Sequence, residues 1–340
     1  DGSNLTGIAA TNFNTQTVAA IGAATTIDLS AGNMITFNQN ANTTVSFAST
    51  SEAMDLTLIR PGGERNVAIS YATGAVTFDG NGDYLSLATS ADFAFGTGDF
   101  TIEFWQKLDT IADAPHELDF RVDGSDTGTT NSLVLYVWGT DDKLHFWVNG
   151  SNRISSIDTI PTGQWQHVAL VRNSGTTTLY LDGVSQGTYA DSTNYGSSSS
   201  NSNPLTIGQR QGSYASNSWD GEISNLRIVK GTAVYTSKFL PPTEALTNVT
   251  NTKLLCCQST SSTTTAAVTP GTITATGNVT AGAQTISASG TYPTQGSITW
   301  PSSINWNNGT APSWDTTNTI SQEWNQIQLI TRDSGVTWYG

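Results

Sequence analysis

Residues 163–188, GQWQHVALVRNSGTTTLYLDGVSQGT, decide the fold class. Trp165, His167 and Ala169 alternate along the chain with Gln166, Val168 and Leu170. An apolar run covers 168–171 and is followed by a Ser-Gly turn. A second run rich in β-formers, 178–181, ends at Asp-Gly. Short runs between such turn signals predict antiparallel hairpins. His167 is then expected to be a half-buried cross-strand residue; the alternative, a ligand or proton-transfer role, lacks a second His or Cys nearby.

Composition narrows the class of protein. The 340 residues are enough for two or three domains, and 36% of them are hydrophobic. Charged residues make up only 12%, well under the usual share, and Ser, Thr, Asn and Gly take their place. This surface is typical of an extracellular or virion β-protein. The chain begins at Asp1, as expected of a fragment or a processed chain.

Charge and hydropathy exclude two classes of partner. The formal net charge is −14 and the pI is about 4.3, so no basic stripe for nucleic acid exists. No apolar stretch reaches the roughly 20 residues that a membrane-spanning helix needs. We therefore expect neither nucleic-acid binding nor membrane insertion.

The two cysteines are adjacent, Cys256 and Cys257, in KLLCCQ. Neighbouring residues of a strand point to opposite faces, which disfavours an ordinary disulfide between them. Their spacing does not match a zinc site. We interpret both as small buried hydrophobes.

The chain is expected to divide into a charged middle and polar flanks. Residues 75–255 hold 19 of the 27 acidic and 10 of the 13 basic side chains. Both flanks consist of short Ser/Thr-rich alternating strands, and we expect them to form one domain split by the middle, because insertion at a surface turn is well tolerated. A plain string of three domains is the alternative. The expected boundaries are 1–12 (a fibre linker), 13–74 (N-terminal part of the β scaffold), 75–255 (the middle domain), 256–292 (a Thr/Ser-rich return segment) and 293–340 (C-terminal part of the scaffold).

Three motifs in order carry a family resemblance. VTFDGNGDYLSLATSADFAFGTGDFTIEFWQKLD (76–109), the hairpin 163–188 and WDGEISNLRIVKGTAVYTSKFLPPT (219–243) resemble the laminin-G-like, concanavalin A-like lectin/glucanase jelly roll. The resemblance implies two antiparallel sheets packed face to face. Gly or Ser interrupts every candidate helix. We predict an all-β chain, with this jelly-roll sandwich inserted in or flanked by a smaller β-sandwich or barrel domain.

The flanks carry a second resemblance. SAGNMITFNQNANTTVSFAS, SITWPSSINWNNGTAP and LITRDSGVTWYG are similar to tail-fibre and other virion structural proteins of marine and cyanobacterial phages, and DGSNLTGI to their linkers. This resemblance implies a location in the virion. It also implies a homo-oligomer, usually a homotrimer, in contact with other virion proteins.

One stretch of the sequence bears on whether the protein is a glycosidase. In HELDFRVDGSD (116–126), Glu117 and Asp119 are expected on one strand face, similar to the E-L-D-x-x-E signature of retaining glucanases of this fold. The closing Glu is missing; Arg121 takes a position on the same face, and Asp123 follows. An Arg beside a carboxylate lowers its pKa, which does not suit a general acid. We expect a solvated face of acids around Arg121. A Ser-His-Asp triad has no G-x-S-x-G elbow here, so we predict no enzyme.

Binding of sugar is a better expectation. Aromatic rings stack on sugar faces while neutral polar groups meet the hydroxyls. The glycan-binding candidates are Trp138, Trp147, Tyr189, Tyr195 and Tyr214. Each of them also has an alternative role in packing alone.

Calcium is the accessory ion that the family resemblance implies. Candidate oxygen donors are Asp79, Asn81, Asp83 and Asp220, in FDGNGDY and WDGEI. Turn chemistry alone also explains these residues, because Asp-Gly and Asn-Gly form turns without a metal.

Three functions remain open. The first is a non-enzymatic tail-fibre or appendage segment whose lectin-like domain attaches to a host-surface glycan or protein. The second is a capsid or tail decoration protein that stabilises the particle without binding a ligand. The third is a glycan depolymerase, which would need two free carboxylates in a cleft.

Overall fold

The structure is a computed structural model. It describes residues 15–21, 24–27, 34–39, 43–47, 54–61, 64–122, 131–196, 203–212, 217–293, 298–299, 304–305, 324–331 and 338–339. The chain folds into two compact units, one made of residues 1–65 and 291–340 and the other of residues 66–290. In the described part, every regular element except one short 3₁₀ helix, Ala91–Phe93, is a strand.

The unit formed from both chain ends contains two sheets. The larger has the strand order β1 (Thr15–Ile21), β3 (Met34–Gln39), β5 (Met54–Pro61), β24 (Trp324–Thr331), β25 (Trp338–Tyr339) and β23 (Ile304–Asn305). The smaller has the order β2 (Ala24–Ile27), β4 (Thr43–Phe47) and β22 (Ile298–Thr299).

Successive strands of this unit alternate between the two sheets, so β1, β3 and β5 pair in parallel, as do β2 and β4. The sequence patterns did not predict this parallel pairing. The antiparallel pair of β5 with β24 joins the N-terminal to the C-terminal part of the chain, over Met54–Pro61 and Trp324–Thr331.

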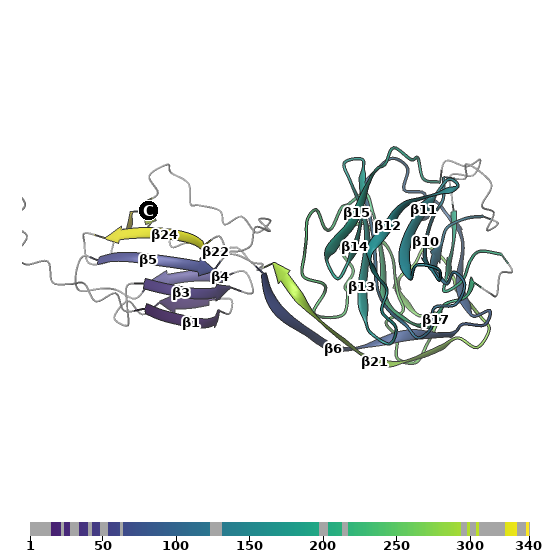
Figure 1. The fold of residues 1–340 in the computed structure, drawn as a ribbon, viewed down its shortest axis with the longest axis horizontal. Helices are drawn as coiled ribbons and strands as arrows, with labels where there is room; N and C mark the ends of the chain where they lie inside the picture. Colours follow the sequence, from purple (N-terminus) through teal and green to yellow (C-terminus); the bar gives the residue numbers. More distant parts are fainter. Residues whose placement is uncertain are drawn as a thin grey trace, which may run out of the picture. The chain divides into compact units, whose positions relative to one another are not determined.

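The unit 66–290 is a sandwich of two antiparallel sheets (Figure 1). The seven-stranded sheet has the order β12 (Ser151–Thr159), β11 (Lys143–Val148), β10 (Leu133–Trp138), β9 (His116–Asp119), β16 (Asn203–Ile207), β7 (Tyr84–Ser90) and β20 (Ile273–Thr276). The second sheet has the order β15 (Val184–Ala190), β14 (Thr176–Leu181), β13 (Gln166–Asn173), β8 (Phe100–Leu108), β17 (Asp220–Lys230), β18 (Thr252–Cys256) and β19 (Ala266–Val268).

Two long strands border this unit in the chain. β6 (Glu64–Asp79) pairs with β17, and β21 (Thr280–Pro293) pairs with β6, so entering and leaving segments run side by side (Figure 1). The range 256–292 was expected to be a return segment. It contributes β20 to the seven-stranded sheet and β19 to the second sheet.

Period-2 alternation builds the core between the sheets. On β10, Leu133, Leu135 and Val137 are buried in one hydrophobic cluster with side chains of the facing sheet, such as Phe104 and Ile228. The other residues of β10 therefore lie on the opposite face of the seven-stranded sheet, which carries the site described below.

The hairpin 163–188 forms as predicted, with β13 and β14 paired from Val168–Leu181 to Asn173–Thr176. His167 differs from the prediction, because it is fully buried rather than half-buried. Its Nε2 lies 3.4 Å from Oε2 of Glu103, whose Oε1 accepts hydrogen bonds from Nε and Nη2 of Arg227 at 2.9 and 2.6 Å. Burial raises the pKa of Glu103, but the interactions with His167, Arg227 and Tyr235 outweigh it and leave that pKa below its usual value.

Candidate functional site

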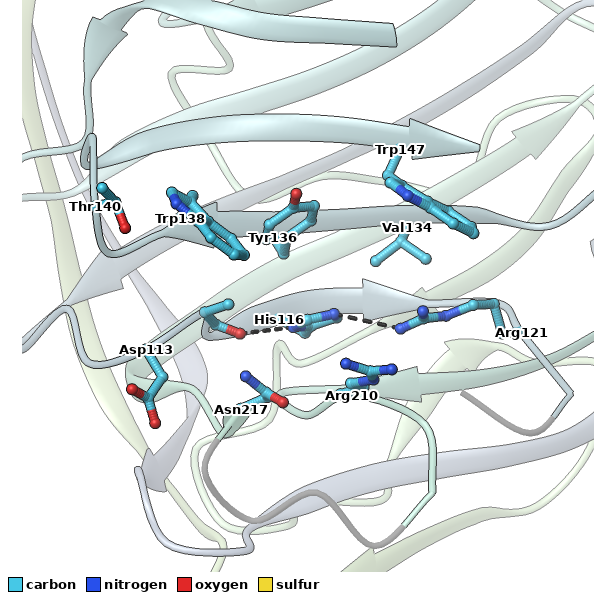
Figure 2. Close-up of a pocket in the computed structure, with 11 residues that line it drawn as sticks. Asp113, His116, Arg121, Val134, Tyr136, Trp138, Thr140, Trp147, Arg210 and Asn217 are labelled. Atoms are coloured by element: carbon cyan, nitrogen blue, oxygen red, sulfur yellow. Dashed lines mark hydrogen bonds between the residues drawn. The ribbon is translucent and has the colours of Figure 1, made fainter. Parts of the chain in front are cut away.

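A pocket of about 460 Å³ opens on the face of the seven-stranded sheet that points away from the core. Figure 2 shows Trp138, Tyr136 and Val134 in a row along β10, with His116 and Arg121 in a second row beside it. The lining residues are Asp113, Ala114, His116, Arg121, Val134, Tyr136, Trp138, Thr140, Trp147, Arg210 and Asn217.

Three aromatic rings from neighbouring strands form a stack, and two of them, Tyr136 and His116, line this pocket. Tyr136 on β10 is in register with His116 on β9 and with His145 on β11. Each imidazole lies 5.2 Å from the Tyr136 ring at an interplanar angle of 22°. The Tyr136 hydroxyl donates to Oδ1 of Asn152 at 2.9 Å, which fixes the ring from the far side.

A β-bulge in β9 points His116 into the pocket. Asp119 pairs with Val134 and Leu118 with Leu135, but His116 pairs with Tyr136, so Glu117 is the extra residue. Without this bulge His116 would point into the core like Leu118. The bulge also leaves Glu117 fully buried, and neither of its carboxyl oxygens has a hydrogen-bond partner among the described residues.

His116 is held as a neutral imidazole. Burial lowers its pKa to about 4, the Asp119 carboxylate opposes this, and the cations Arg121 and Arg210 add to it. Nδ1 lies 2.7 Å from the backbone oxygen of Ala114 and therefore carries the proton. Nε2 is left as the acceptor that faces Nη2 of Arg121 at 3.4 Å (Figure 2).

Arg121 also lines the pocket, and hydrogen bonds to Asp119 hold its guanidinium in place. Its Nε and Nη2 donate to both oxygens of Asp119 at 2.6–3.1 Å, and both residues are buried. The guanidinium carbon lies 5.3 Å from the centroid of the Trp147 ring, a cation–π arrangement. The backbone N–H of Gln211 donates to Asp119 at 2.9 Å and links the loop after β16 to this pair.

Trp138 is the exposed aromatic of the pocket, with 45% of its surface accessible. Its ring meets Tyr136 edge-on, with centroids 6.0 Å apart and an angle of 78°. A free ring face above ordered polar groups suits a ligand that has both an apolar face and hydroxyls.

A second pocket of about 490 Å³ lies further along the same sheet and shares Arg210. It is lined by Gly82, Tyr84, Ser86, Thr206, Gln209, Arg210, Gln211 and Gly212. A single register row joins the two pockets: Trp147 pairs with Val134, Val134 with Asp119, Asp119 with Thr206, and Thr206 with Ser86. At about 4.8 Å per strand, this row is about 19 Å long.

The predicted glycan-binding residues divide into four groups. Trp138 and Trp147 line the first pocket. Tyr189 lies outside both pockets, edge-on to Phe146 and beneath the guanidinium of Arg153.

Tyr195 corrects the prediction, because it is 1% exposed and its hydroxyl donates to Oδ2 of Asp191 at 2.8 Å, so its ring belongs to the core. Tyr214 lies outside the described residues.

The carboxylates among the candidate calcium ligands accept hydrogen bonds from other protein groups, some within the turn 79–83 and some from distant segments. Asp83 accepts the backbone N–H groups of Asp79 at 3.1 Å and Asn278 at 2.5 Å. Asp79 accepts the N–H of Asn81 at 2.9 Å, and Asp220 accepts the Thr110 hydroxyl. Among the residues that the structure describes, no three His, Cys, Asp or Glu side chains gather in a metal-binding group.

The expected solvated face around Arg121 is wrong. Glu117, Asp119 and Arg121 are all at most 2% exposed, and the bulge separates Glu117 from the face that Asp119 shares with Arg121. Asp123 lies outside the described residues. Asp119 is occupied by Arg121 and the Gln211 amide.

Sequence reasoning missed His116, Tyr136 and Arg210 as pocket residues. Alternation within YVW could have placed Tyr136 on the face of Trp138. His116 gave no such signal, because its orientation depends on the bulge. Arg210 follows β16, and no local pattern shows which strand lies beside it.

The family model described as "Concanavalin A-like lectin/glucanases superfamily" (Laminin_G_3) matches residues 79–233. Residues 79–233 thus match the model of a concanavalin A-like lectin/glucanase domain, and the predicted all-β class with a jelly-roll sandwich is confirmed. No curated protein matches the chain.

Three solved structures illustrate the similarity. A native heptameric SAP-like pentraxin from Limulus polyphemus is 19% identical with a TM-score of 0.41, over 62% of this chain and 94% of that one. A putative carbohydrate binding protein from Bacteroides ovatus is 18% identical with a TM-score of 0.44, over 64% of this chain and 60% of that one. Domain 4 of AbnA, an arabinanase from Geobacillus stearothermophilus, is 16% identical with a TM-score of 0.38, over 48% of this chain and 84% of that one.

The described residues contain no helix with the length and apolar character needed to cross a membrane.

Proposed function

We propose that the jelly-roll domain binds glycans in the pocket on the outward face of the seven-stranded sheet. The observation that carries this proposal is the exposed ring of Trp138 beside the ordered stack of Tyr136 and His116. Trp138 supplies a free apolar surface for a sugar face, and Thr140, Asn217 and Asp113 supply oxygens and an amide for its hydroxyls. Because the floor is fixed by hydrogen bonds, little ordering accompanies binding.

The proposed ligand is a chain of several sugars rather than a single one. Two pockets lie along one register row and share Arg210. The second is lined by uncharged polar side chains such as Ser86, Thr206 and Gln209, which suit hydroxyl groups.

Binding without hydrolysis is part of the proposal. Glycosidases use two carboxyl groups on either side of the scissile bond, one of them free to act as an acid. Asp119 is held by Arg121 and an amide, and Glu117 is not among the residues that line either pocket. Incubation of the full chain with the polysaccharide that it binds should release no reducing ends.

The biological setting that we propose is a phage virion. The support is the resemblance of the flanking sequences to tail-fibre proteins, together with a composition low in charged residues and rich in Ser, Thr and Asn. In this setting the chain is a tail-fibre or appendage segment, assembles with copies of itself as a homotrimer, and contacts other virion proteins. The lectin-like domain then meets the host-surface glycan.

The test is binding of the full chain to immobilised host-surface polysaccharides and to neutral oligosaccharides of graded length. Trp138→Ala should weaken binding at least tenfold, which corresponds to about 1.4 kcal/mol. Ile157→Ala is the matched control, because Ile157 is 70% exposed on β12 and lies outside both pockets, so it should bind like wild type.

Each measurement is made with calcium and with a chelator. Loss of binding in chelator would assign a calcium site and direct attention to Asp79, Asp83 and Asp220. Absence of saturable binding under both conditions would refute the adhesin and favour a decoration protein that stabilises the particle.

A further inference from the structure

The adjacent cysteines lie where β18 ends. Cys256 is the last residue of that strand and pairs with Leu226 on β17 and with Ala266 on β19. Cys257 has a φ of 61°, a left-handed conformation that side chains other than glycine seldom adopt. The alternation of the strand is therefore broken at Cys257.

The break brings both thiols to the same side. Both side chains are 1% exposed and belong to the hydrophobic cluster between the sheets, and the two Sγ atoms lie 3.5 Å apart. This arrangement corrects the expectation that neighbouring side chains here point to opposite faces. It confirms that the cysteines are buried.

The surroundings hold the unusual turn in place. The backbone N–H of Asn225 donates to the Cys257 oxygen at 3.2 Å. The side-chain amide of Gln258 donates to Oδ1 of Asn225 at 2.6 Å and to the Leu246 oxygen at 2.7 Å. A left-handed residue persists where several contacts fix it, as they do here.

We propose that Cys256 and Cys257 are a modification site that closes to a vicinal disulfide with a small-molecule disulfide, and that this bond is reversible. Both thiols are free in the structure, and their sulfur atoms need to approach from 3.5 Å to the bonded distance of about 2.05 Å. Adjacent Cα atoms are about 3.8 Å apart, below the usual 4.4–6.8 Å for a disulfide, so a dithiol reduces the bond easily.

The chemistry is two thiol–disulfide exchanges. One cysteine thiolate attacks a sulfur of the small disulfide, forms a mixed disulfide and releases one small thiolate. The second cysteine thiolate attacks the protein sulfur of the mixed disulfide, closes the ring and releases the other small thiolate. The two protons lost by the cysteines pass to the two leaving thiolates. In sum, two protein thiols are oxidised and one small disulfide is reduced to two thiols.

Burial determines when this reaction occurs. The hydrogen bond with Cys257 and burial raise the pKa of Cys256 well above its usual value, so its thiolate is scarce in the folded chain. A small disulfide also cannot reach sulfur atoms that are 1% exposed. Closure therefore proceeds while the chain folds or when β18 opens locally, and it is slow in the fully folded protein.

The test is refolding of the full chain from denaturant in a glutathione redox buffer. The sample is then quenched in acid, unfolded with an alkylating reagent and weighed by intact mass spectrometry. The expected product is lighter by two hydrogen atoms and carries no alkyl group, and dithiothreitol restores two alkylation sites. Cys256→Ser and Cys257→Ser each keep one thiol and should show one alkyl group or one glutathione.

A second arm isolates the contribution of the fold. The same wild-type chain kept in denaturant with the same redox buffer should close to a much smaller extent, because nothing then holds the sulfur atoms together. Three results would overturn the proposal: two alkyl groups on the refolded wild type, a stable glutathione adduct or disulfide-linked dimer, or equal closure in denaturant.

Discussion

Glu117 offers the sharpest test of the site's architecture. The bulge in β9 buries this side chain completely, and neither oxygen has a hydrogen-bond partner among the described residues. Burial raises the pKa of its carboxyl from 4.5 to about 8. The folded protein therefore carries a neutral Glu117 at pH 7, whereas the unfolded chain carries an ionised one.

The effect of Glu117 on the free energy of unfolding follows from proton linkage. Above pH 4.5 the unfolded chain loses this proton while the folded chain keeps it, so stability falls as pH rises and levels off above pH 8. At about 1.36 kcal/mol per pH unit, the cost is about 1 kcal/mol at pH 5, about 3 at pH 7 and about 4 at pH 8. Glu117→Gln has nearly the same shape and no proton to lose, so it removes this cost.

The assay is denaturant unfolding of the full chain at pH 5 and pH 8, followed by intrinsic tryptophan fluorescence. The free energy of unfolding of Glu117→Gln should be higher than that of wild type, and this difference should be about 3 kcal/mol larger at pH 8 than at pH 5. Glu244→Gln, at an exposed position, is the control and should change neither value. Parallel pH profiles for wild type and Glu117→Gln would refute the buried, unpartnered carboxyl.

Three further changes probe the same region. Asp119→Asn removes the carboxylate that binds the buried Arg121 and should lower the free energy of unfolding by about 3–5 kcal/mol, measured in urea; a loss under 1 kcal/mol would contradict the buried pair. His116 has a pKa lowered from 6.5 to about 4, so this residue alone should lower stability by about 3 kcal/mol as pH drops through that range, because only the unfolded chain gains the proton; the gain from Glu117 opposes this loss in wild type. The free energy of unfolding of His116→Gln relative to wild type should therefore rise by about 3 kcal/mol between pH 6.5 and pH 4, and a constant difference would show that His116 does not titrate in this way. Gly208→Ala places a Cβ 2.5 Å from the Phe78 ring at a φ of +86° and should cost at least about 2 kcal/mol, visible as a lower melting temperature; an unchanged melt would mean that the ring moves aside.

The sandwich was predictable because its signals are local. Alternation in 163–188 and the Ser-Gly and Asp-Gly turns define β13 and β14 before any long-range contact is known. The parallel pairing of β1, β3 and β5 was not predictable, because each partner lies beyond an intervening strand of another sheet. Local alternation shows that a segment is a strand but not which strand lies beside it.

The pocket was only half predictable for a similar reason. Trp138 and Trp147 were identified because large aromatics in a polar hairpin are conspicuous. His116 faces the pocket only because one extra residue shifts the register of β9, and a bulge leaves no mark in the surrounding letters. Tyr195 stands in a Ser/Asn-rich stretch that suggests exposure, yet the buried partner Asp191 holds its hydroxyl in the core.

The pairing of β6 with β21 has a consequence for how such chains diversify. Since the two strands that border the sandwich are hydrogen-bonded neighbours, its entry and exit points are about one strand spacing apart. A different domain with paired terminal strands can then replace it through two junctions, without moving the chain ends that it interrupts. Recombination at these two points exchanges the whole sandwich domain in one step.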